Sequence, residues 1–83
     1  MNHVKISQDD VTTARDFSEG NPVQVRIMVS HDDTNYQKGR MVKVHYNNRE
    51  AEAVIVSEPI VISRDLEKKS KVLSLVVEQD VDA

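Results

Sequence analysis

The sequence of 83 residues predicts an α+β domain that is mostly β: a small, partly closed antiparallel β-barrel of five or six short strands with one N-terminal helix. Three observations predict this class. Two alternating stretches flank Asn47-Asn48, residues 23–29 alternate in the same way, and residues 71–78 are almost continuously apolar. Only the stretch before Gly20 has helical spacing. Closure of the sheet would remove exposed strand edges, so we expect a barrel with the helix plugging one end.

The strongest local pattern is a hairpin that turns at Asn47-Asn48, within the stretch from Gly39 to Pro59. Asn tolerates the positive φ that a type I′ turn needs at both central positions. With these residues as the loop, apolar side chains fall on one face and charged side chains on the other, and a slip of one residue would scatter both sets. The predicted facing pairs are Val42/Ala53, Val44/Ala51, Lys43/Glu52, His45/Glu50 and Tyr46/Arg49.

A helix is predicted to begin after Ser7, because Ser7-Gln8-Asp9-Asp10 has the spacing of a capping box. It should run to about Glu19, with Gly20 in the left-handed conformation that ends helices and Pro22 preventing continuation. The residues expected on its buried stripe are Val11, Ala14 and Phe17.

The remaining strands are expected at residues 4–6, 23–29, 60–62 and 71–78. Pro59 marks residues 60–62 as a strand start or edge, whereas the apolar run 71–78 is typical of a central strand. Residues 30–39 form a polar loop, and residues 63–70 a turn or a single helical turn. We expect one compact domain over residues 1–78 and a frayed tail over 79–83.

Composition narrows the classes of function. The net charge is −3, with five basic and six acidic residues in 1–40 and six and eight in 41–83, so the strongly basic footprint of most nucleic-acid-binding domains is missing. The chain has no cysteine, no apolar run of about 20 residues and no signal-peptide core at its start. We therefore expect a cytoplasmic protein without a membrane span.

The loop His31-Asp32-Asp33 with Asn35 combines an imidazole with carboxylates. A calcium loop needs Gly at its sixth position, and counting from Asp33 that position is Lys38. We interpret the loop as a solvated turn in which Asp and Asn side chains bond to the nearby backbone.

Other candidate chemistry is equally sparse. His3, His31 and His45 do not have the spacing of zinc ligands. His45 opposite Glu50 could act as an acid/base pair, but the hairpin register places no nucleophile beside them, which favours an exposed cross-strand pair. The only cluster of basic residues is interleaved with Asp65 and Glu67, a mixture of charges that is typical of a solvated connector. The alternative interpretation of this cluster is a phosphate-binding patch. Its members are Arg64, Lys68, Lys69 and Lys71.

Two stretches, residues 20–26 (GNPVQVR) and 38–44 (KGRMVKV), give the chain a resemblance to ASCH domains, which are PUA-like β-barrels. The similar portion spans residues 4–57. Family members place a lysine two residues after the glycine and often an arginine five residues beyond, where this chain has Pro22 and Ile27, with Arg26 one position short. The resemblance implies a barrel and RNA association, but not the hydrolytic activity of some relatives.

The leading hypothesis is a non-enzymatic binding or protein-interaction module that meets a protein partner or a second copy through an exposed sheet face or edge. An RNA-associated PUA/ASCH-like domain is the alternative, and a small hydrolytic enzyme using His31, Asp32, Asp33 or His45 is the third. We predict no catalytic residue, cofactor or metal ligand. Met28, Met41, Val54 and Val56 fall opposite the predicted core and could form an apolar patch. The candidate binding surface comprises Arg26, Met28, Met41, Lys43, Arg64, Lys68 and Lys69.

Overall fold

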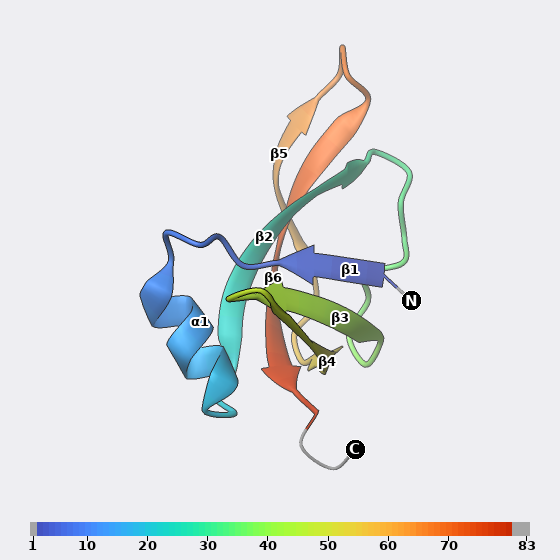
Figure 1. Ribbon diagram of the computed structural model, residues 1–83. Helices are drawn as coiled ribbons and strands as arrows, with labels where there is room; N and C mark the ends of the chain where they lie inside the picture. Colours follow the sequence, from blue (N-terminus) through green and yellow to red (C-terminus); the bar gives the residue numbers. More distant parts are fainter. Residues whose placement is uncertain (1, 81–83) are drawn as a thin grey trace.

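The computed structural model describes residues 2–80, in which six strands form one sheet and a single helix covers one end of it (Figure 1). The elements are β1 (Asn2–Lys5), α1 (Val11–Ser18), β2 (Val23–Ser30), β3 (Met41–Tyr46), β4 (Arg49–Ile55), β5 (Ile60–Asp65) and β6 (Ser70–Gln79). The strand order is β1-β3-β4-β6-β2, and β5 also pairs with β6. This confirms the predicted mostly-β, partly closed barrel with one helix.

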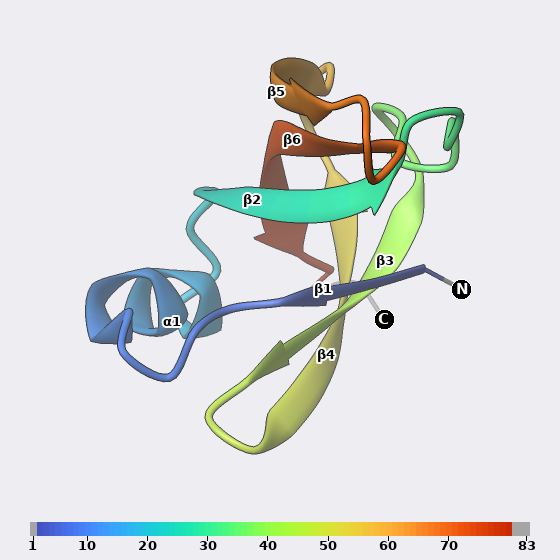
Figure 2. The same ribbon diagram turned by 90° about the horizontal axis from the view of Figure 1, so that it is seen from above.

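The barrel differs from the prediction in one respect: its sheet is mixed, because β1 pairs with β3 in parallel. The other ladders are antiparallel. β1 and β2 approach each other without forming a ladder, so the barrel is left open along a seam between them. Figure 2 shows α1 at one end of the barrel, beside the end of β1 and the start of β2.

The predicted hairpin is confirmed residue by residue. Val42 pairs with Ala53 and Val44 with Ala51. Asn47 and Asn48 have φ values of 47° and 60°, as a type I′ turn requires. The register follows from local chemistry alone, because a two-residue loop leaves the strands only one way to keep their apolar sides together.

The predicted start of the helix is wrong by one turn. The Ser7 carbonyl accepts from Asp10 N at 3.0 Å and Ser7 Oγ accepts from Asp9 N at 3.3 Å, so Ser7 closes a separate turn. Asp10 is the N-cap, and its Oδ1 accepts from Thr13 N at 3.1 Å. Val11 is therefore the first helical residue, and its side chain is 60% exposed rather than buried as expected.

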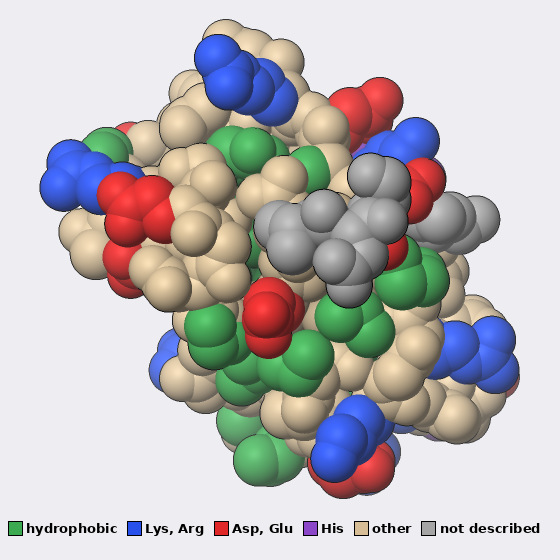
Figure 3. Space-filling model, turned by 90° about the horizontal axis from the view of Figure 1, so that it is seen from below, with side chains coloured by type: hydrophobic (Ala, Val, Ile, Leu, Met, Phe, Trp, Pro, Cys, Tyr) green, Lys and Arg blue, Asp and Glu red, His purple; other side chains and the backbone are tan. Residues whose placement is uncertain are grey.

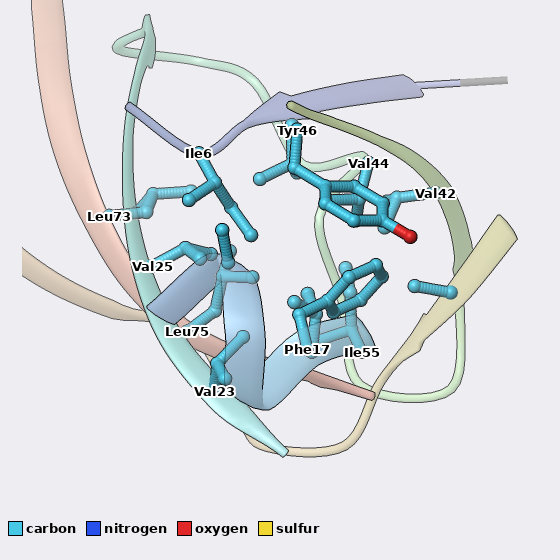
Figure 4. Packing of buried hydrophobic residues seen from close by; sticks show 14 residues of the cluster. Ile6, Phe17, Val23, Val25, Val42, Val44, Tyr46, Ile55, Leu73 and Leu75 are labelled. Atoms are coloured by element: carbon cyan, nitrogen blue, oxygen red, sulfur yellow. The ribbon is translucent and has the colours of Figure 1, made fainter. Parts of the chain in front are cut away.

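The core lies between the barrel wall and the inner side of α1 (Figure 4). Phe17 is completely buried and meets the ring of Tyr46 edge to face, with ring centroids 5.1 Å apart. As expected, Ala14 and Phe17 carry the contact of the helix, and Gly20 ends it at a φ of 87°. The core cluster consists of Val4, Ile6, Ala14, Phe17, Val23, Val25, Val42, Val44, Tyr46, Ala53, Ile55, Leu73, Leu75 and Val77.

β6 is the central strand, as its apolar run predicted. It pairs with β2 along most of its length, with β4 near its C-terminal end and with β5 in its N-terminal half. β4 and β5 thus follow one edge of β6 in succession, with a register shift between them and a bulge at Ile62. The prediction of a turn over residues 63–70 is wrong in part, because β5 continues to Asp65 and β6 resumes at Ser70.

Beyond the barrel, β5 and the adjoining halves of β6 and β2 continue as a three-stranded projection, residues 26–30 and 60–74, which we call the arm. It occupies the top of Figure 1 and contributes to a longest dimension of 38 Å. At the other end of β6, Gln79 is still in the strand and Asp80 N donates to Glu52 O at 2.9 Å. Residues 81–83 of the predicted tail lie outside the described residues.

Candidate functional site

The arm exposes large apolar side chains. Leu66 is 87% exposed, Met28 72% and Ile60 63%, and Val61 and Ile62 are also exposed. Arg26 and Ile60 flank Ser74, and Met28 and Ser63 flank Val72, so these rows share the side of the arm away from the core. We call this side the outer face; it consists of Arg26, Met28, Ile60, Ser63, Val72 and Ser74.

The arm has two edges without a further ladder, β2 on one side and β5 on the other, and all residues of β5 are exposed. Three features oppose regular pairing with another strand. Pro59 precedes β5, Ile62 forms a bulge, and Arg64-Asp65 add charge to its end. Proline, bulges and charges are the devices by which natural sheets protect their edges. These features disfavour strand addition at the β5 edge.

The structure brings together only some of the predicted surface residues. Arg26 and Met28 lie on the outer face. Arg64 pairs with Lys71 and so belongs to the opposite side of the arm. Lys68 and Lys69 lie in the turn at the tip of the arm, residues 66–69. Met41 and Lys43 lie on β3, opposite Val54 and Glu52 of β4. The expected patch of Met28 with Met41 is thus divided between the arm and the barrel.

Sequence reasoning missed Ile60, Ile62 and Leu66 as surface residues. Three consecutive branched aliphatics, Ile60 to Ile62, normally indicate a buried strand, and only Pro59 pointed to an edge. Leu66 was assigned to a connector, and nothing in its neighbourhood distinguishes an exposed leucine from a packed one.

His31, Asp32 and Asp33 take part in hydrogen bonds just after β2, next to the turn at the tip of the arm. His31 N donates to Lys69 O at 2.9 Å, and Ser30 Oγ donates to Asp32 Oδ1 at 2.7 Å. That hydroxyl is the main reason why the pKa of Asp32 is lowered. Asp33 Oδ1 accepts from Asn35 N at 2.8 Å, so these side chains act as a turn, as interpreted from the sequence.

A second group of titratable side chains, His3, His45 and Glu50, lies on the outside of the barrel, across β1, β3 and β4. His45 faces Glu50 as predicted, with Nδ1 and Oε2 3.4 Å apart. His45 Nε2 is also 2.7 Å from His3 Nδ1, and the ring centroids are 5.0 Å apart with planes inclined by 25°. The facing nitrogens therefore point almost directly at each other, which is the geometry of a shared proton. The sequence could not reveal His3 here, because the parallel pairing of β1 was not predicted.

The two rings are surrounded by balanced charge. Lys43 pairs with His3 and Lys5 with His45 in the β1–β3 ladder, while Glu50 and Glu52 come from β4. Within residues 2–80, no three histidine, aspartate or glutamate side chains are placed to hold a metal ion.

Tyr36 forms a hydrogen bond with the backbone of β1 at His3. Its hydroxyl donates to His3 O at 3.1 Å. Burial, followed by the nearby charge of Asp33, raises the pKa of Tyr36.

Of the three open hollows that Lys5 lines, two also involve residues of other strands. The larger, about 480 Å³, reaches the hairpin turn and is lined by His45, Asn48 and Glu50 among others. The smaller, about 300 Å³, lies at the seam between β1 and β2 and is lined by Asp10 and Arg26 among others. The Asp10 carboxylate already caps α1, and its bond to Thr13 lowers its pKa. Among the hydrogen bonds of residues 2–80, no serine or threonine hydroxyl bonds to a histidine ring.

Charge is dispersed over the surface. Figure 3 shows one side of the molecule, on which basic and acidic side chains are interspersed and hydrophobic side chains gather around an acidic one.

Within the described part of the chain, no helix is long and apolar enough to cross a membrane. No known family model matches the chain, and searches of curated proteins and of solved structures find no match.

Proposed function

We propose that this protein is a non-enzymatic binding module that contacts a protein partner through the outer face of its arm. One observation carries the proposal: Met28 and Ile60, two of the most exposed apolar side chains, share this face of a projecting element. Full burial of such a side chain contributes about 1.5–3 kcal/mol, so two of them at the centre of a contact give it substantial affinity. Arg26 on the same face supplies a polar rim.

The composition of the outer face favours a partner that presents apolar side chains. Met28 has an unbranched, flexible side chain that adapts to differently shaped surfaces. Ser63 is an exposed small residue on this face, whereas Ser74 is buried and accepts from Gln24 Nε2 at 2.6 Å. The proline, the bulge and the charges at the β5 edge argue against a partner that adds a strand there.

RNA association is the alternative, and the tip of the arm supports it, because Arg64, Lys68 and Lys69 lie at or next to the turn. Acidic side chains are interleaved with these cations. Asp65 Oδ1 accepts from Glu67 N and Lys68 N, at 3.1 and 3.2 Å, so this carboxylate is engaged by the turn itself.

A selection of random displayed peptides against the whole protein, followed by NMR mapping of the selected peptides, tests the proposal. We expect the largest shift changes at Met28, Ile60 and Val72, and loss of binding in Ile60→Lys. Val11→Lys is the matched control, because Val11 is equally exposed but lies on α1. Peptides that map to the barrel, or that lose binding equally in both variants, would refute the proposal.

The RNA alternative is separated by titration with short single-stranded RNAs at low salt. Phosphate contacts are strongest there and weaken steeply as salt is added. Shift changes at Lys68 and Lys69 that vanish at high salt would favour RNA, whereas an unchanged spectrum counts against it.

A further inference from the structure

β1 is attached to the barrel on one side only. Its four residues pair with β3, and Ile6 N donates to His45 O at 2.9 Å just beyond the strand. On its other side β1 has no ladder with β2. Yet Val4 and Ile6 are core residues, 1% and 5% exposed, so the core depends on a strand held by a single ladder.

The side-chain bond between His3 and His45 crosses this ladder. A hydrogen bond between two imidazoles needs one ring nitrogen with a proton and one without. With the His45 Nδ1 proton directed at Glu50, His45 Nε2 accepts from His3 Nδ1. When one proton is added at His3 Nε2, the bridging proton passes from His3 Nδ1 to His45 Nε2. His45 is then an imidazolium next to Glu50 and donates from Nε2 to His3 Nδ1, so the bond persists with its direction reversed.

A second added proton ends this arrangement, because both facing nitrogens then carry hydrogen at a separation of 2.7 Å. The groups that face the rings are the cations of Lys5 and Lys43 and the carboxylates of Glu50 and Glu52, drawn from β1, β3 and β4. Two lysines and two glutamates balance, so one added proton leaves this face with one uncompensated positive charge and the second proton places another beside it. Tyr36, which bonds to the His3 carbonyl, is uncharged over the range in which histidine titrates.

We propose that the His3–His45 pair is a proton-sensitive latch that holds β1 on the barrel and releases it when both rings are protonated. Release breaks the β1–β3 ladder and withdraws Val4 and Ile6 from the core, which widens the existing seam between β1 and β2. The rest of the sheet stays paired, since β6 joins β2, β4 and β5 without β1. This device is independent of the proposed contact through the arm.

Amide hydrogen exchange tests the latch in the whole protein. We compare protection of the Ile6 amide, which donates to His45 O, with that of the Val56 amide, which donates to Val76 O, between about pH 7.5 and about pH 5.5. After correction for intrinsic exchange, we expect the Ile6 amide to lose protection about tenfold relative to Val56 at the lower pH, the scale of one lost hydrogen bond. His45→Gln keeps an amide near the position of Nε2 but cannot be protonated, and should remove the pH dependence.

His31→Gln is the matched control, because it removes a histidine at the base of the arm tip and should leave the pH dependence of Ile6 intact. An Ile6 amide that responds to pH equally in wild type and His45→Gln would overturn the proposal. NMR of the ring nitrogens provides a test without mutation. We expect a coupling through the hydrogen bond between the facing nitrogens of His3 and His45 near pH 7.5 that disappears near pH 5.5, whereas no coupling at either pH, or one unchanged by pH, would overturn the latch.

Discussion

Phe17→Ala tests whether α1 is packed into the barrel as described. Phe17 is completely buried and meets Tyr46 edge to face, so the substitution removes both a filled volume and an aromatic pair. Truncation of a buried Phe to Ala costs about 3–5 kcal/mol. A chain of 83 residues has a free energy of unfolding of roughly 4–12 kcal/mol at typical values per residue. We therefore expect the variant to lose between about a quarter and all of its stability.

Urea unfolding followed by far-UV circular dichroism measures this loss, and tyrosine fluorescence gives a second probe because the chain has no tryptophan. Val11→Ala is the control: its side chain is 60% exposed, so we expect a change within about 0.5 kcal/mol. A Phe17→Ala variant destabilised by less than about 1 kcal/mol, or one no worse than Val11→Ala, would show that the helix does not carry the contact assigned to it.

Three further predictions concern single side chains. Asn48→Val should destabilise the protein by about 1–2 kcal/mol in urea unfolding, because a β-branched residue resists the left-handed conformation at φ 60°, whereas Asn48→Gly should be neutral within a few tenths. Asp10→Ala should lower the urea midpoint at neutral pH, and Asp10→Asn should lower it less, because the amide keeps the capping acceptor but not the charge. Since its bond to Thr13 lowers the pKa of Asp10, the ionised carboxylate stabilises the fold above the ordinary pKa of aspartate, and this part is lost as pH falls through the lower folded value. Tyr36 has a raised pKa, so its contribution is complete below about pH 10 and is lost as pH rises through the folded value; Tyr36→Phe should flatten the alkaline end of a stability profile, and an unchanged profile would contradict this.

The sequence predicted best what is decided by neighbours in the chain. The hairpin needs only two turn residues and alternating strands, so Val44 opposite Ala51 could be read directly. The parallel pairing of β1 with β3 joins segments about 40 residues apart through no turn of their own, and no local pattern specifies such a partner. The helix start was wrong because Ser7 and Asp10 are both good caps, and tertiary packing decides between them.

The same distinction applies to the candidate sites: contacts set by the hairpin register could be predicted, and contacts that depend on long-range strand pairing could not. His45 opposite Glu50 came from the hairpin register, but the bond from His45 to His3 depends on the unpredicted ladder. The exposure of Ile60 depends on β5 having no neighbour beyond it, which is a property of the finished sheet rather than of residues 60–62.

The position of β6 in the chain has a consequence for synthesis on the ribosome. β2, β4 and β5 all pair with β6 and all precede it, so none of these ladders can form until β6 has left the exit tunnel. Only the β3–β4 hairpin, the β1–β3 ladder and the short helix have their partners earlier. The nascent chain therefore carries the aliphatic residues of β2 uncovered until β6 has emerged, which is the interval in which a chaperone would meet them.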